Sequence, residues 1–80
     1  MSANQTLMTF HFDTHKDLHY VEVVYFEKGR YVERKSKYEV PEAIGQLYQR
    51  TVNKMTDEKK QCLVMHRDAN HQLIKSFYRP

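Results

Sequence analysis

A two-residue loop, Lys28-Gly29, constrains the fold of this chain more than any other feature. It lies between two segments that read as strands, 18–26, which is rich in valine and aromatic residues, and 31–40. Gly29 can adopt the positive φ that a tight hairpin loop requires. The pattern predicts a β-hairpin. Its first strand is expected to be central, because the strand is apolar on both of its faces.

The loop also predicts the pairing of the two strands. Glu27 faces Arg30 and Phe26 faces Tyr31, and a regular ladder continues with two further pairs, Val23 opposite Arg34 and Glu22 opposite Lys35. Opposite charges then meet across the strands, which is typical of a correct register. In this register the helix packs on the face that carries Val21, Val23, Tyr25, Val32, Tyr38 and Val40.

The remaining elements follow from hydrophobic periodicity. Residues 7–13 alternate as a strand does, and a turn at 14–17 joins them to the next strand, placing Met8, Phe10 and Phe12 on the face of the helix. A helix is expected over about 41–56, with Pro41 in its first turn, and two short strands over 61–66 and 71–78. Its apolar stripe consists of Ile44, Leu47, Tyr48, Val52 and Met55. Gly45 is interpreted as a place of close packing between helix and sheet.

This order, β-β-β-α-β-β, predicts an α+β two-layer sandwich in which one amphipathic helix covers one face of an antiparallel sheet. The 80 residues are expected to form a single domain, with 1–5 as a disordered tail. A lone cysteine, Cys62, cannot form an internal disulfide and favours a reducing compartment. No signal peptide and no membrane-spanning apolar run is visible, so the expected location is cytoplasmic, with no membrane partner.

The face opposite the helix is expected to carry an apolar patch among charged residues. Such a patch is typical of an interface, and a chain this small gains stability from a second copy. The alternative is ordinary exposed surface. The predicted interface residues are Leu18, Tyr20, Val24, Phe26 and Tyr31. They indicate a protein partner of unknown identity, and a homodimer is the commonest arrangement.

Positive charge is concentrated in residues 28–37, which hold five basic residues and one acidic residue, although the whole chain has a net charge of only +3. The segment is either a phosphate-binding surface or a solvated strand whose lysines prevent aggregation. The nucleic-acid candidates are Arg30, Arg34, Lys35 and Lys37. In the predicted register, Lys35 and Lys37 share a face with the aromatic residues Tyr20, Phe26 and Tyr31, while Arg34 lies on the other face.

No motif for catalysis or cofactor binding is present, and the chain is predicted not to be an enzyme, with little room for a ligand cavity. The histidines His11, His15 and His19 are spaced like metal ligands, but the predicted register points His11 and His19 to opposite faces, so no metal site is expected. Cys62 is interpreted as a buried hydrophobic residue. His66 and His71 flank a hairpin loop, where they form either ordinary polar strand ends or a pH-sensitive pair.

The sequence therefore predicts a small, non-enzymatic binding or regulatory protein that acts through protein–protein contact and self-associates. The alternative is a nucleic-acid-binding module that uses the basic, aromatic strand face.

Overall fold

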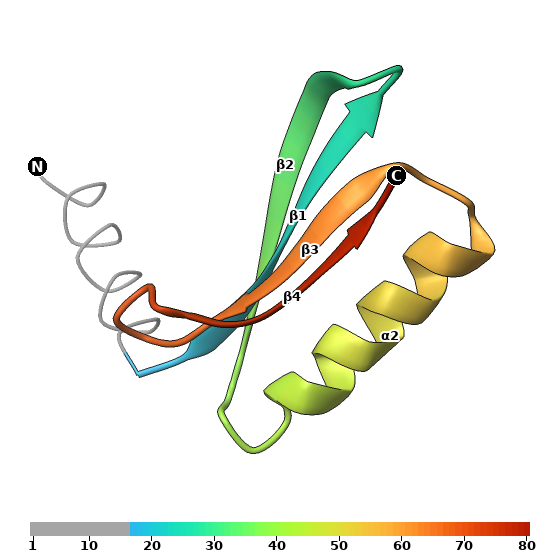
Figure 1. Ribbon diagram of the computed structural model, residues 1–80. Helices are drawn as coiled ribbons and strands as arrows, with labels where there is room; N and C mark the ends of the chain where they lie inside the picture. The colour runs from blue at the N-terminus through green and yellow to red at the C-terminus, as the bar shows by residue number, and fades with distance from the viewer. Residues whose placement is uncertain (1–16) are drawn as a thin grey trace, which may run out of the picture.

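The computed structural model describes residues 17–80, which form one four-stranded antiparallel sheet and one helix (Figure 1). The elements in chain order are β1 (His19–Glu27), β2 (Arg30–Glu39), α2 (Ile44–Asp57), β3 (Cys62–Arg67) and β4 (Leu73–Arg79). The strand order across the sheet is β2-β1-β3-β4, and α2 packs on one face. The predicted α+β two-layer architecture is confirmed. The strand predicted at 7–13 lies outside the described residues.

Strand β1 is central, as predicted. Five consecutive residues from Tyr20 to Val24 are buried, because β1 has a paired strand on each side and the helix on one face. Both edges of β1 are occupied, by β2 and by β3.

The loop between β1 and β2 has the predicted two residues. Lys28 and Gly29 both have positive φ, 54° and 80°, as a type I′ hairpin turn requires. The first two predicted pairs, Glu27 with Arg30 and Phe26 with Tyr31, are confirmed.

An irregularity in the ladder changes the pairing beyond that point. The register shifts between Tyr25 and Phe26, so that Tyr25 faces Glu33 and Val32 is an extra residue on β2. The predicted pairs of Val23 with Arg34 and of Glu22 with Lys35 are wrong by one position. Val24 faces Arg34, and Val23 faces Lys35.

A shift of one residue reverses the face on which every later side chain of β2 lies. Lys35 and Lys37 pair with Val23 and Val21 and lie on the helix side of the sheet. Arg34 and Tyr38 lie on the opposite side, which we call the open face. The prediction that Tyr38 belongs to the helix-covered face is wrong, and Val40, expected there too, is exposed just beyond the end of β2.

The core lies between α2 and the middle of the sheet. The predicted helix stripe is confirmed, and it packs on residues of β1, β3 and β4. The buried members are Val21, Val23, Ile44, Leu47, Tyr48, Met55, Cys62 and Val64, with Tyr25, Val52 and Phe77 packed against them. No residue of β2 belongs to this core. The helix therefore packs mainly on β1 and β3 and on Phe77 of β4, and the residues of β2 remain exposed beside it, apart from the half-buried Glu39 at the end of the strand.

The ends of α2 differ by a few residues from the prediction. Pro41 lies in a turn that precedes the helix, in which the Ala43 amide donates to the Val40 carbonyl at 3.0 Å. At the other end, the Lys60 amide donates to the Met55 carbonyl and the Lys59 amide donates to the Thr56 carbonyl, at 3.2 and 3.1 Å. These bonds form a Schellman motif, in which Lys59 takes the left-handed conformation with φ 55°.

Gly45 does not serve close packing. It is exposed near the start of α2, and a Cβ atom placed on it would meet no atom within 4 Å. The interpretation made from the sequence is therefore wrong.

The loop between β3 and β4 is organised by Asp68. Its side chain accepts hydrogen bonds from the amides of Asn70 and Gln72 at 2.8 and 3.0 Å. The Gln72 bond is the main cause that holds the pKa of this carboxyl below its ordinary value. A second register shift follows the loop, so that Arg67 faces Leu73, His66 faces Lys75, and Ile74 is the extra residue.

In the described part of the chain, no helix is long and apolar enough to cross a membrane.

Candidate interaction surfaces

One carboxylate lies between two guanidinium groups at the centre of the open face. Glu22 on β1 contacts Arg34 on β2 through Oε2 at 3.0 Å and Arg67 on β3 through Oε1 at 3.3 Å. Because the carboxylate is largely buried, removal of either charged contact should destabilise the fold more than removal of a surface ion pair would. The group ties three strands together side by side.

The five predicted interface residues lie along the open face but are unequally accessible. Tyr20 and Val24 are buried among the side chains of the neighbouring strands, and Leu18 and Phe26 are half-buried. Only Tyr31, which is 62% exposed beside the hairpin loop, presents most of its side chain to solvent. Truncation of Tyr20 or Val24 would therefore disturb the fold as well as any interface.

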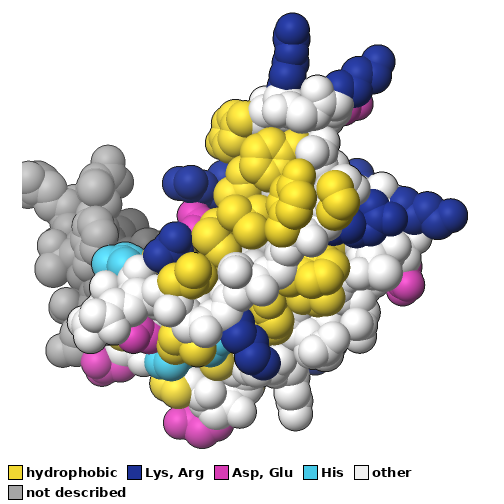
Figure 2. All heavy atoms as spheres, viewed as in Figure 1, with side chains coloured by type: hydrophobic (Ala, Val, Ile, Leu, Met, Phe, Trp, Pro, Cys, Tyr) yellow, Lys and Arg dark blue, Asp and Glu magenta, His cyan; other side chains and the backbone are white. Residues whose placement is uncertain are grey.

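Other apolar side chains are more exposed than the predicted ones. The exposed large hydrophobic residues include Val32 and Tyr38 on β2, and Leu73, Ile74 and Tyr78 on β4. Figure 2 shows hydrophobic side chains in a band from the β1–β2 hairpin down across the sheet. The sequence does indicate that Ile74 and Tyr78 share one face of β4, because residues 74, 76 and 78 alternate with Lys75, Phe77 and Arg79. The same alternation cannot show that β4 is an edge strand.

Two histidine contacts lie at the end of the sheet where β1 begins. His19 Nδ1 and His66 Nε2 are 3.0 Å apart, and the Tyr20 hydroxyl lies 2.9 Å from His71 Nδ1. Tyr20 also stacks on Tyr38, with ring centroids 5.1 Å apart. The suggested pairing of His66 with His71 is therefore wrong, because each has a different partner on β1.

His66 is buried beside Tyr48 of the helix. Its pKa lies below the ordinary histidine value, first because burial disfavours the charged ring, and then because His19 and Lys75 repel a second positive charge. Asp68 acts in the opposite direction. The hydrogen bond between the two rings needs one nitrogen to donate and the other to accept.

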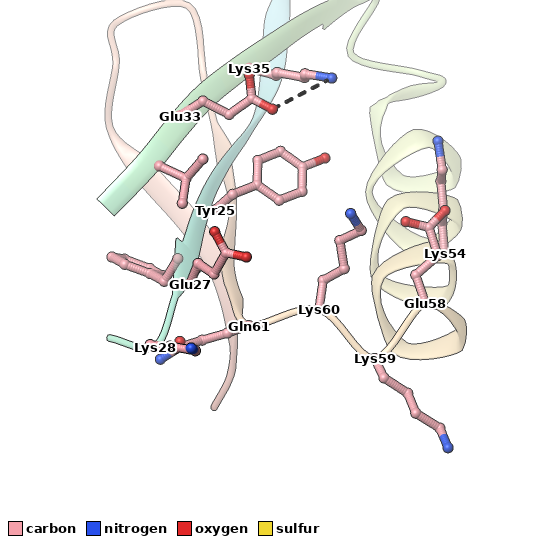
Figure 3. A pocket seen from close by; sticks show the side chains of 12 residues that line it. Tyr25, Glu27, Lys28, Glu33, Lys35, Lys54, Glu58, Lys59, Lys60 and Gln61 are labelled. Carbon is pink, nitrogen blue, oxygen red and sulfur yellow. Dashed lines mark ion pairs between the residues drawn. The ribbon is translucent and has the colours of Figure 1, made fainter. Parts of the chain in front are cut away.

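A groove runs along the helix side of the sheet, between β2 and α2. It consists of two adjoining open depressions of about 470 and 530 Å³ that share Tyr25, Lys35 and Lys54. Figure 3 shows the larger one, with the Tyr25 ring projecting from β1 between Lys35 and Lys60. The ammonium groups of Lys35 and Lys60 lie 5.8 and 6.0 Å from the centre of the Tyr25 ring. The expectation of little room for a cavity is wrong, because the uncovered strand β2 leaves this space open.

The two parts of the groove differ in charge. The smaller part has four charged residues, all cationic: Lys35 and Lys37 from β2, and Arg50 and Lys54 from α2. We call this part the cationic groove. In the larger part, cations alternate with the acids Glu27, Glu33 and Glu58, and Lys35 lies 3.9 Å from Glu33. Arg50 and Lys54 were not among the predicted site residues, although their spacing of four residues places them on one side of the helix.

The four nucleic-acid candidates do not converge on one surface. Lys35 and Lys37 line the cationic groove, whereas Arg34 lies on the open face in contact with Glu22. Arg30 is exposed at the hairpin turn. The prediction that Lys35 and Lys37 share a face with Tyr20, and that Arg34 does not, is wrong because of the register shift at Val32.

Residues 17–80 contain no group of three side chains suited to hold a metal ion. His11 and His15, two members of the sequence pattern considered above, lie outside the described residues. Cys62 is fully buried in the core, as predicted, and burial raises the pKa of its thiol. A neutral, inaccessible thiol is a poor nucleophile, which agrees with its interpretation as a packing residue.

Comparison with known proteins adds no relative from which a function could be inferred. No family model matches the chain, and no curated protein and no solved structure matches it.

Proposed function

We propose that this chain is a non-enzymatic protein-binding module that self-associates through the outer edge of β4. The observation that carries the proposal is the contrast between the two edges of the sheet. An edge strand exposes unpaired backbone groups that can pair with another chain unless charged side chains prevent it. Strands β2 and β4 are the two edge strands of the described sheet, and they are protected to different degrees.

The edge at β2 is strongly charged. Six of its ten residues are ionic, which are Arg30, Glu33, Arg34, Lys35, Lys37 and Glu39. The edge at β4 has only two charged residues among seven, Lys75 and Arg79, and both alternate away from the open face. Ile74 and Tyr78 project from β4 on that face and are 50% and 56% exposed. Charge therefore favours pairing at β4 over pairing at β2.

The sequence of β4 is compatible with pairing to a second copy of itself. A two-fold axis perpendicular to the sheet would run two β4 strands antiparallel and place the open faces of both copies on one side. With the axis at Ser76, Ile74 of each copy faces Tyr78 of the other, and no like charges are opposed. An axis at Lys75 or at Phe77 would instead set Lys75 opposite another cation. The axis at Ser76 is therefore the favoured one.

Sedimentation equilibrium of the full chain over a range of concentrations tests this proposal. Wild type is expected to dimerise, and Ile74→Lys should weaken the dimer by about tenfold or more, since it places a cation in the apolar contact. Val32→Lys is the matched control, because Val32 is also an extra residue in the ladder, also 50% exposed, and lies on the charged edge. A monomeric wild type, or equal loss in both variants, would refute pairing at β4.

A further inference from the structure

We infer that the cationic groove binds an acidic amphipathic helix of a protein partner. This site lies on the helix side of the sheet, away from the open face, so it is independent of self-association through β4.

Positive charge lines both walls of the groove. Lys35 and Lys37 stand on the β2 wall, and Arg50 and Lys54 stand on the α2 wall, with no acid among the residues that line this part. All four side chains are exposed. A ligand that lies along the groove would therefore meet cations on both of its sides, which favours acidic residues along both flanks.

The floor between these walls is formed by the apolar side chains of β1 and α2. Val21, Val23, Leu47 and Met55 are buried in the core, and the half-buried ring of Tyr25 is the most accessible of the five. The aliphatic stems of the lysines extend this apolar surface up the walls. A ligand with a narrow apolar stripe between two acidic rows matches this arrangement, and an amphipathic helix presents such a stripe at spacings of three and four residues.

The fold leaves room for a helix at this place. Because α2 packs mainly on β1 and β3 and no core residue comes from β2, a second helix could lie beside α2 over the helix side of β2. Helices pack at about 8–10 Å from each other, so such a ligand would contact Arg50 and Lys54 on one side and β2 on the other. The partner helix would complete the half-covered layer.

Nucleic acid fits the groove less well. Proteins that bind single strands combine cations with exposed aromatic rings on one surface. Here the exposed rings of Tyr31, Tyr38 and Tyr78 lie on the open face or its hairpin end, whereas the clustered cations lie on the helix side. The one ring in the cationic groove, Tyr25, already has two ammonium groups near it. The aromatic surface and the positive surface are thus separated by the sheet.

Fluorescence anisotropy with a labelled synthetic peptide tests the inference. The probe is a peptide of about 18 residues with leucines at helical spacing and glutamates on both flanks. A scrambled peptide of identical composition controls for charge alone, and a single-stranded oligothymidine of matched charge controls for nucleic acid. The patterned peptide is expected to bind full-length protein about tenfold or more tightly than the scrambled one, with affinity that falls as salt rises.

Charge reversal locates the site. Lys35→Glu and Arg50→Glu should each weaken binding of the patterned peptide by about tenfold, because each sets a like charge against the glutamates. Arg30→Glu makes the same change of net charge outside the groove and should leave the affinity nearly unchanged. Three results would each overturn the inference. They are equal affinity for the patterned and scrambled peptides, tighter binding of the oligonucleotide than of the patterned peptide, and equal effects of all three variants. Circular dichroism of each variant verifies that the fold is retained.

Discussion

At the scale of single residues, His66 is the buried histidine of the described chain. It is buried, contacts His19 across the sheet, and faces Tyr48 of α2, Lys75 of β4 and Asp68 of the adjoining loop. Its pKa is lower in the folded protein than the ordinary value of about 6.5. Below about pH 6.5, His66 therefore binds a proton more readily in the unfolded chain than in the folded chain, and the free energy of unfolding falls as pH falls.

The pH dependence of unfolding should therefore reflect His66. Stability is expected to be complete above about pH 6.5 and to decline below it by at most about 1.4 kcal/mol per pH unit from this one group. Urea unfolding over about three pH units, from about pH 5 to about pH 8, measures the slope. His66→Gln should flatten the slope in this range, whereas His71→Gln, which leaves the His19–His66 contact in place, should keep it. An unchanged slope in His66→Gln would contradict this assignment.

At the scale of elements, the two glycines of the chain have opposite roles. Gly29 has a φ of 80° in the hairpin turn, a conformation that strains any residue with a Cβ atom. Gly45 lies exposed in α2, where a methyl group would meet no neighbour. Gly29→Ala should lower the free energy of unfolding by about 1 kcal/mol, and Gly45→Ala should raise it by up to about 1 kcal/mol. Thermal or urea unfolding of both variants checks the opposite signs, and a shift in the same direction would contradict this account of the turn and helix.

The elements also show which parts of the fold could be read from the sequence. The turn at Lys28-Gly29 and the apolar stripe of α2 were predictable, because each depends on neighbours along the chain. The faces of β2 were not predictable, because the hydrophobic pattern gives no sign of the one extra residue, Val32, that reverses them. The misplaced Lys35, Lys37 and Tyr38 all follow from this single residue.

At the scale of the whole molecule, the candidate sites depend on strand order, which no local pattern determines. Insertion of β3 beside β1 makes β4 an edge, and so exposes Ile74 and Tyr78. The same order places α2 away from β2 and opens the cationic groove. The sequence could predict an apolar open face, but not that Tyr20 and Val24 would be buried within it while β4 carries the exposed side chains.

Disulfide trapping tests the central claim, pairing of β4 with a second copy around Ser76, most directly. In an antiparallel pair, residues directly opposite each other have Cα atoms about 4.5–5.5 Å apart, within the range that a disulfide can bridge. Ser76→Cys should therefore form a covalent dimer rapidly under mild oxidation at micromolar concentration, while the buried Cys62 stays inert. Ser36→Cys, an exposed serine on β2 on the same face of the sheet, is the matched control and should remain monomeric on a non-reducing gel. Two results would contradict pairing at β4: equally fast cross-linking of Ser36→Cys and Ser76→Cys, or no cross-linking of either variant.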